Sequence, residues 1–178
     1  MAYGDRPRER LIAPATPFLS VQQRDNTWAL NADTFVWFDT INSITSHFEI
    51  IGEEKILIHH SGFYEICFEA SSYLYSGLLD YIYYQIEEFE TKTPIPGSRG
   101  YIPMSGAKQE DVHSVTIHCY AFLEKDSAIG VAAYVGNGGG TAAETVAGSG
   151  RLTIQFMPTR GWNNSAGGHI EYKGGVMR

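Results

Sequence analysis

The chain has 178 residues, which is enough for one domain with a sizeable hydrophobic core. Its formal net charge of −7 at pH 7 argues against a nucleic-acid-binding protein, because such a protein needs a basic surface. Its 19 glycines, 11 tyrosines and 9 phenylalanines are typical of an all-β protein with many turns and aromatic strand faces.

The N-terminal segment is basic, contains prolines and shows no hydrophobic period. It is predicted to form an extended arm, residues 1–17. Arg6, Arg8 and Arg10 are candidates for binding an acidic or phosphate-bearing surface, although a solvated terminus explains them equally well. No apolar segment follows these charges, so the pattern is not that of a secretory signal. The sequence indicates folding in the cytosol, unless a leader has been removed. No run approaches the ~20 apolar residues of a membrane span.

From Phe18 onward, short β-prone runs follow one another at the spacing of a β-sandwich or barrel. The clearest run follows Gly62, where hydrophobic and polar positions alternate. A period of two marks a strand with one buried face. One parity of this run holds Tyr64, Ile66, Phe68 and Ala70, and the other holds Phe63, Glu65, Cys67 and Glu69. The predicted strands are 18–22, 28–30, 35–40, 46–50, 55–60, 63–73, 79–89, 112–124, 127–135 and 150–157.

Two segments between these strands are predicted to be long loops. Residues 91–108 hold three prolines and three glycines, and residues 136–150 are rich in glycine. Loops of this length usually carry recognition or contact a neighbour. Residues 158–178 form a glycine-rich C-terminal tail, which leaves residues 18–157 as the folded domain.

The histidines His59 and His60, followed by Glu65, suggest a metal site of the cupin type. Two imidazoles that bind one ion from one strand need even spacing, because adjacent side chains point to opposite faces. The pair is therefore more simply explained as strand-end histidines. We predict no catalytic residue, no metal and no cofactor, and hence a protein that is not an enzyme.

The acidic cluster of Glu87, Glu88 and Glu90 is expected to be a solvated strand end. Calcium binding here stays open, although no Asp-x-Asp spacing supports it. Cys67 and Cys119 each lie inside a predicted strand and are expected to be free, packed thiols. A disulfide between them stays open, because it requires adjacent strands and an oxidising compartment.

Three segments resemble the jelly-roll domain shared by complement-type globular heads and tumour-necrosis-factor-like ligands. The family's "I-x-x-x-G-x-Y-x-F" pattern corresponds here to residues 58–66, with Ser61 in place of the usual proline before the glycine. The resemblance implies a jelly-roll β-sandwich that assembles as a homotrimer. The three segments read Phe38-Asp39-Thr40, Phe48-Glu49-Ile50 and IHHSGFYEI at 58–66.

The predicted strand at 115–123 is largely apolar on both faces towards its end. A sandwich strand should be polar on its outer face, so this face is expected to be covered by another subunit or by the terminal arms. The resembled family packs aromatic residues of this kind around a three-fold axis. Tyr120, Phe122 and Tyr134 are the residues that the resemblance carries over to an oligomer interface.

The sequence therefore predicts an all-β jelly-roll homotrimer with extended arms at both ends. The first functional hypothesis is a structural or adhesive virion component, such as a bacteriophage head-decoration, fibre or receptor-binding module. Its location would be the virion, and its partners other capsid proteins, with the arm as anchor. The alternative is a secreted, complement-head-like ligand or glycan-binding module that contacts a surface glycan or receptor.

Overall fold

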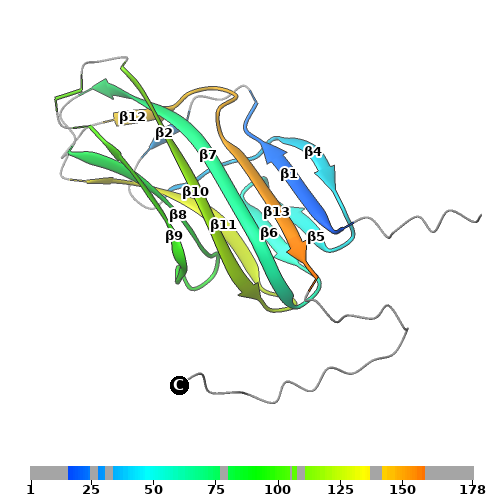
Figure 1. Cartoon of the computed structure of the whole chain (residues 1–178). Helices are drawn as coiled ribbons and strands as arrows, with labels where there is room; N and C mark the ends of the chain where they lie inside the picture. The colour runs from blue at the N-terminus through cyan, green and yellow to red at the C-terminus, as the bar shows by residue number, and fades with distance from the viewer. Residues whose placement is uncertain are drawn as a thin grey trace, which may run out of the picture.

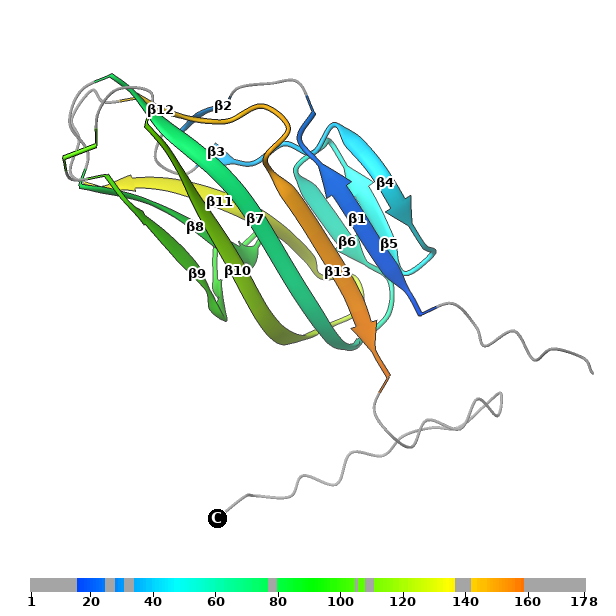
Figure 2. The ribbon, with the colours of Figure 1, turned by 45° about the horizontal axis from the view of Figure 1, so that its top comes forward.

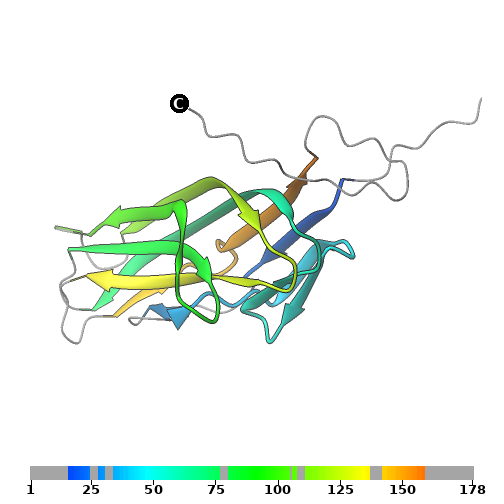
Figure 3. The same ribbon diagram turned by 90° about the horizontal axis from the view of Figure 1, so that it is seen from below.

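The computed structural model of the chain describes residues 16–24, 28–30, 34–76, 80–104, 106–107, 111–136 and 142–158. Every regular element within these ranges is a β-strand. The strands form two antiparallel sheets, packed face to face as a jelly-roll sandwich (Figures 1 and 2), and Figure 3 shows the two layers from below. Within the described segments, no helix is long and apolar enough to cross a membrane.

The first sheet is organised around the long strand β7. β10 pairs with one edge of β7, while β12 and β13 share the other edge, β13 along its first half and β12 along its second. The sheet continues through β1 to β4 on one side and ends at β2 on the other. Its members are β1 (Phe18–Gln22), β2 (Trp28–Leu30), β4 (Thr40–Ile44), β7 (Gly62–Ser76), β10 (Val112–Leu123), β12 (Ala142–Thr145) and β13 (Arg151–Met157).

The second sheet has the strand order β5-β6-β11-β8-β9, and the short β3 pairs with β11 next to β6. β9 forms one edge of this sheet. Its members are β3 (Thr34–Phe35), β5 (Phe48–Ile51), β6 (Lys55–Ile58), β8 (Tyr81–Glu88), β9 (Pro94–Pro103) and β11 (Ala128–Gly136).

The core lies between the two sheets and follows the alternation read from the sequence. The predicted apolar parity of β7 is buried, and Phe68 at its centre has no exposed surface. Phe68 lies edge-on to Phe38, with ring centroids 6.5 Å apart, and contacts Tyr84 of the opposite sheet at 5.2 Å. Burial of one strand face is therefore what holds the two sheets together.

A buried hydroxyl group links the two sheets through the core. Tyr84 on β8 is fully buried, and its hydroxyl lies 2.6 Å from Ser72 Oγ on β7 and 3.0 Å from Thr145 Oγ1 on β12. Tyr84→Phe should lower the free energy of unfolding by about 1–3 kcal/mol, because it leaves two buried hydroxyls without this partner. Urea unfolding measures the loss. Tyr101→Phe is the control, since the exposed hydroxyl of Tyr101 should matter little, and equal losses would contradict the role of the Tyr84 hydroxyl.

Both predicted loops contain a strand, so the sequence-based prediction was wrong in each. β12 lies within 136–150, and β9 lies within 91–108 in spite of its prolines. An edge strand tolerates proline because one side of its backbone needs no hydrogen bonds. β9 pairs only with β8, Pro94 and Pro103 stand at its ends, and the register shifts opposite Gln85 to Glu87, which accommodates the middle of the strand.

Some sequence-based predictions concern residues outside the described ranges. The arm at 1–17 is described only at residues 16–17, and the tail at 158–178 only at residue 158. Arg6, Arg8 and Arg10 lie outside the described residues. The extended arm, the tail and the anchoring role of these arginines therefore remain predictions.

Candidate functional site

Apolar side chains gather at one end of the outward face of the first sheet. This apolar patch consists of Phe63, Tyr120, Phe122 and Met157, each between 39% and 56% exposed. The strands that carry them, β10, β7 and β13, lie side by side (Figure 2), and Phe63 is the register partner of both Phe122 and Met157. The rings of Phe63 and Phe122 meet edge to face at 5.3 Å.

Next to the patch, polar side chains on the same face hold Tyr120 in place. His118 Nε2 lies 2.7 Å from Glu65 Oε1, and the Tyr120 hydroxyl donates to the same oxygen at 3.4 Å. Desolvation, followed by the Glu65 carboxylate, raises the pKa of Tyr120, so the phenol stays protonated at neutral pH. The patch therefore carries no charge of its own.

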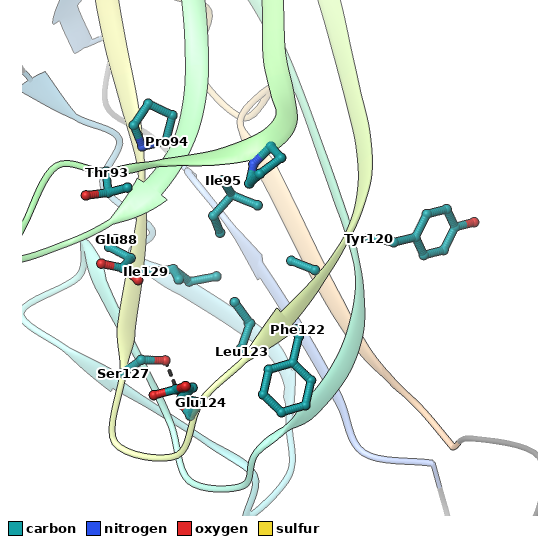
Figure 4. A pocket seen from close by; sticks show the side chains of 12 residues that line it. Glu88, Thr93, Pro94, Ile95, Tyr120, Phe122, Leu123, Glu124, Ser127 and Ile129 are labelled. Carbon is teal, nitrogen blue, oxygen red and sulfur yellow. Dashed lines mark hydrogen bonds between the residues drawn. The ribbon is translucent and has the colours of Figure 1, made fainter. Parts of the chain in front are cut away.

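A groove of about 540 Å³ opens beside the patch, at the edge of the sandwich between β9 and β10. Figure 4 shows Ile95, Leu123 and Ile129 lining its interior, while Tyr120 points away from it to the outer surface. Phe122 stands at its rim. The groove and the apolar patch thus form one continuous surface that runs from the edge of the sandwich onto the outward face of the first sheet.

The two cysteines lie on adjacent strands but face opposite ways, and both are free thiols. Cys67 on β7 is half-buried on the outward face, where its register partner is His118, while Cys119 on β10 is buried in the core. Burial raises the pKa of Cys119 to about 11. Desolvation, with Glu69 and Glu65 adding to it, also raises the pKa of Cys67.

The structure brings together two of the three aromatic residues predicted for an oligomer interface. Tyr120 and Phe122 share the apolar patch, whereas Tyr134 lies on β11 in the second sheet. There it stacks on Tyr83 with ring centroids 4.7 Å apart. The role of Tyr134 in an oligomer remains a prediction. Phe63 was not among the predicted interface residues, although an aromatic residue on the polar parity of β7 was a signal that this outer face is unusually apolar.

The histidines and acidic residues considered for metal binding have separate surroundings. His59 Nε2 lies 3.3 Å from Glu49 Oε2, while the ring of His60 lies against that of His47 at 4.1 Å. Among the described residues, no three metal-ligating side chains of His, Cys, Asp or Glu come together.

The prediction that all three glutamates at 87–90 are solvated was wrong for Glu87. Glu88 and Glu90 are exposed, but Glu87 is fully buried on the outward side of β8. Its Oε2 accepts hydrogen bonds from Gln85 Nε2 at 3.0 Å and from the Tyr134 hydroxyl at 2.9 Å. The burial arises because Tyr134 comes from the neighbouring strand, which no local pattern in β8 could indicate.

No protein-family model matches the chain, and a search of curated proteins finds no match. Solved structures do match. The globular domain of zebrafish complement 1qA protein is 16% identical, with a TM-score of 0.59, over 80% of this chain and 98% of that one. Eiger TNF from S. frugiperda is 11% identical, with a TM-score of 0.55, over 80% and 94%. Murine APRIL at pH 5.0 is 13% identical, with a TM-score of 0.57, over 80% and 99%.

The fold is that of the complement-head and TNF-like jelly-roll domains. Because the matches cover nearly the whole of the similar chains, the likeness extends to the complete sandwich and not to one sheet of it. At identities of 11–16%, the likeness concerns the fold alone.

Proposed function

We propose that this protein is a non-enzymatic recognition module that assembles as a homotrimer through the outward face of its first sheet. The apolar patch carries this proposal, because four apolar side chains gather there on neighbouring strands and two of its aromatic rings are more than half exposed. Burying one such side chain stabilises an assembly by roughly 1.5–3 kcal/mol, and cyclic symmetry repeats each contact in every subunit.

Two observations favour a second copy of the chain as the partner of this face. The patch is continuous with the groove at the sandwich edge. Each subunit can therefore contact one neighbour through the edge of its sandwich and another through the outward face of its first sheet. The resemblance to complement-type and TNF-like domains implies three-fold assembly with aromatic residues at the axis. The chain's own terminal segments are the competing cover, and the tests below separate the two.

The same comparisons favour the secreted alternative over the virion hypothesis. The similar structures are an animal complement head and TNF-type domains. We therefore propose a secreted ligand or glycan-binding module. The virion hypothesis depends on anchoring by residues 1–17 and 158–178, nearly all outside the described ranges. Deleting residues 1–15 tests that hypothesis, since a truncated protein that still joins assembled particles would contradict an anchoring role.

Light scattering after size-exclusion chromatography tests the assembly directly. The expected mass is about 59 kDa, three times the chain mass of 19.7 kDa. A wild-type protein that elutes as a stable 19.7 kDa monomer would refute the trimer.

The thiol of Cys67 reports independently whether the outward face is covered. Because the pKa of Cys67 is raised, its thiolate fraction is small at neutral pH and alkylation by iodoacetamide should be followed at pH 9. We expect alkylation of Cys67 to be at least tenfold slower in wild type than in Tyr120→Asp, a variant designed to be monomeric. Buried Cys119 is the internal control and should react in neither protein while it is folded.

Each outcome of the alkylation experiment has a distinct meaning. Equal rates in wild type and Tyr120→Asp would mean that no partner covers the outward face. Slow alkylation in a protein that light scattering shows to be monomeric would mean that the chain's own terminal segments cover it, and would contradict assembly through this face.

A further inference from the structure

Four tyrosines form a second aromatic surface, on the outward face of the second sheet. This tyrosine platform consists of Tyr81 and Tyr83 on β8, Tyr101 on β9 and Tyr134 on β11. Tyr83 stands in the middle, paired in register with Tyr134 on one side and Tyr101 on the other. Its ring centroid lies 4.7 Å from that of Tyr134, 5.4 Å from that of Tyr101 and 6.1 Å from that of Tyr81.

Gly136 on β11 makes room for the ring of Tyr81. A Cβ at this position would come within 2.3 Å of the Tyr81 ring, so a side chain would displace that ring. Tyr81, Tyr83 and Tyr134 are half-buried, with their rings packed against neighbours, and Tyr101 is exposed. The four rings therefore hold one another in place, and Tyr101 is the ring that this cluster offers to solvent.

A chain of hydrogen bonds places Arg99 at the edge of this platform. The Arg99 Nε donates to Gln85 Oε1 at 2.6 Å, and Nη2 donates to the same oxygen. Nη1 donates to the Tyr101 hydroxyl at 3.3 Å, and the guanidinium carbon lies 4.8 Å from the Tyr83 ring centroid. The guanidinium is thus held on the platform by one amide, one phenol and one ring.

The side chain of Gln85 is held in turn by a hydrogen bond to the buried carboxylate of Glu87. Gln85 is only 3% exposed, and its amide donates to Glu87, which is fully buried and also accepts from Tyr134. Glu87 Oε1 has no hydrogen-bond partner among the described residues. Burying a carboxylate with an unsatisfied oxygen opposes folding, and a pair of apolar side chains in place of Gln85 and Glu87 would lower the free energy of the folded state. We take this as a sign that the network serves to orient Arg99.

The arrangement leaves Arg99 with unused donors at the surface. An arginine has five N–H groups, and Gln85 and Tyr101 account for three of them, so one remains on Nη1 and one on Nη2. A pair of N–H groups on the two terminal nitrogens matches the two oxygens of a carboxylate. A carboxylate bound there would lie beside the exposed ring of Tyr101.

We propose that the tyrosine platform and Arg99 bind a pyranose sugar that carries a carboxylate. The apolar C–H face of the sugar would lie on the exposed ring of Tyr101, its hydroxyl groups would reach the phenols, and its carboxylate would pair with Arg99. Sites of this kind combine an apolar surface with a few placed polar groups. The proposal rests on the recognition role proposed above, but not on trimer formation, because the platform lies on the other sheet.

Saturation-transfer NMR with the full-length protein tests this proposal. The probes are D-glucuronic acid and N-acetylneuraminic acid, which both carry a carboxylate, with D-glucose as the uncharged comparison. We expect at least one acidic sugar to bind at least tenfold more tightly than glucose, and the two acids show which carboxylated ring fits. Arg99→Lys should weaken the acidic sugar at least tenfold, because lysine cannot keep both the Gln85 contact and a bidentate carboxylate contact.

The variants distinguish this proposal from the proposed assembly. Tyr101→Asp should abolish binding of the acidic sugar and leave the oligomeric mass unchanged, whereas Tyr120→Asp should change the mass and leave sugar binding per subunit unchanged. Equal binding of glucose and the acids, or binding that survives Arg99→Lys in full, would overturn the role of Arg99. No saturation transfer from any of the three sugars would overturn the proposed sugar site. Binding of a proline-rich decapeptide to the platform, in the absence of binding by any sugar, would also overturn it.

Discussion

Replacing Tyr120 with aspartate is expected to convert a trimer of about 59 kDa into a folded monomer of 19.7 kDa. Tyr120 is 56% exposed on a single subunit, so the substitution does not disturb the core. In the trimer, however, the aspartate would be buried without a partner, and burying an unpaired charge outweighs the gain from the remaining contacts. Light scattering measures the mass, and circular dichroism with a β-type spectrum shows that the monomer is folded.

The control for this experiment is Tyr101→Asp. Tyr101 is 54% exposed, so the change in charge and in exposed aromatic area is closely matched, but it lies on the second sheet. We expect this variant to keep the wild-type mass. Phe122→Asp should repeat the effect of Tyr120→Asp, since both residues belong to the apolar patch. Dissociation by Tyr101→Asp but not by Tyr120→Asp would place the interface on the second sheet and contradict the proposed assembly through the first.

Phe68→Ala should lower the free energy of unfolding by about 3–5 kcal/mol, which is a large part of the ~5–15 kcal/mol that stabilises a typical domain. Phe68 has no exposed surface and contacts two aromatic rings, those of Phe38 between β3 and β4 and of Tyr84 on the second sheet. Its removal therefore leaves a cavity that the two sheets cannot close without moving. Urea unfolding followed by fluorescence measures the shift in midpoint.

Phe63→Ala is the matched control, because it removes the same side chain from the same strand on the opposite face. Phe63 is 39% exposed whereas Phe68 has no exposed surface, so we expect the loss of unfolding free energy to be well below that of Phe68→Ala. Both substitutions should be compared in the Tyr120→Asp background, since the stability of an oligomer depends on protein concentration. Equal losses at the two positions would contradict the burial pattern of β7.

The sequence by itself determined the strands whose two faces meet different environments. The alternation of β7 identified its buried face, including Tyr64 and Phe68. In β10 the same period placed Tyr120 and Phe122 on the outer face, although both faces of that strand are largely apolar. Such strands can be read locally, because the hydrophobic effect selects one parity of side chains whatever the neighbouring strands are. The residues at 58–66 added the fold class through their resemblance to jelly-roll domains.

Only the tertiary structure decided which strands are neighbours, and the rest of the functional surface follows from that. β9 is a strand because it lies at an edge beside β8, where its prolines need no partners. Glu87 is buried because Tyr134 approaches from β11, and Tyr134 joins Tyr83 rather than Tyr120 because β11 belongs to the second sheet. Strand pairing brings together residues that are distant in sequence, so no local pattern of side chains records it.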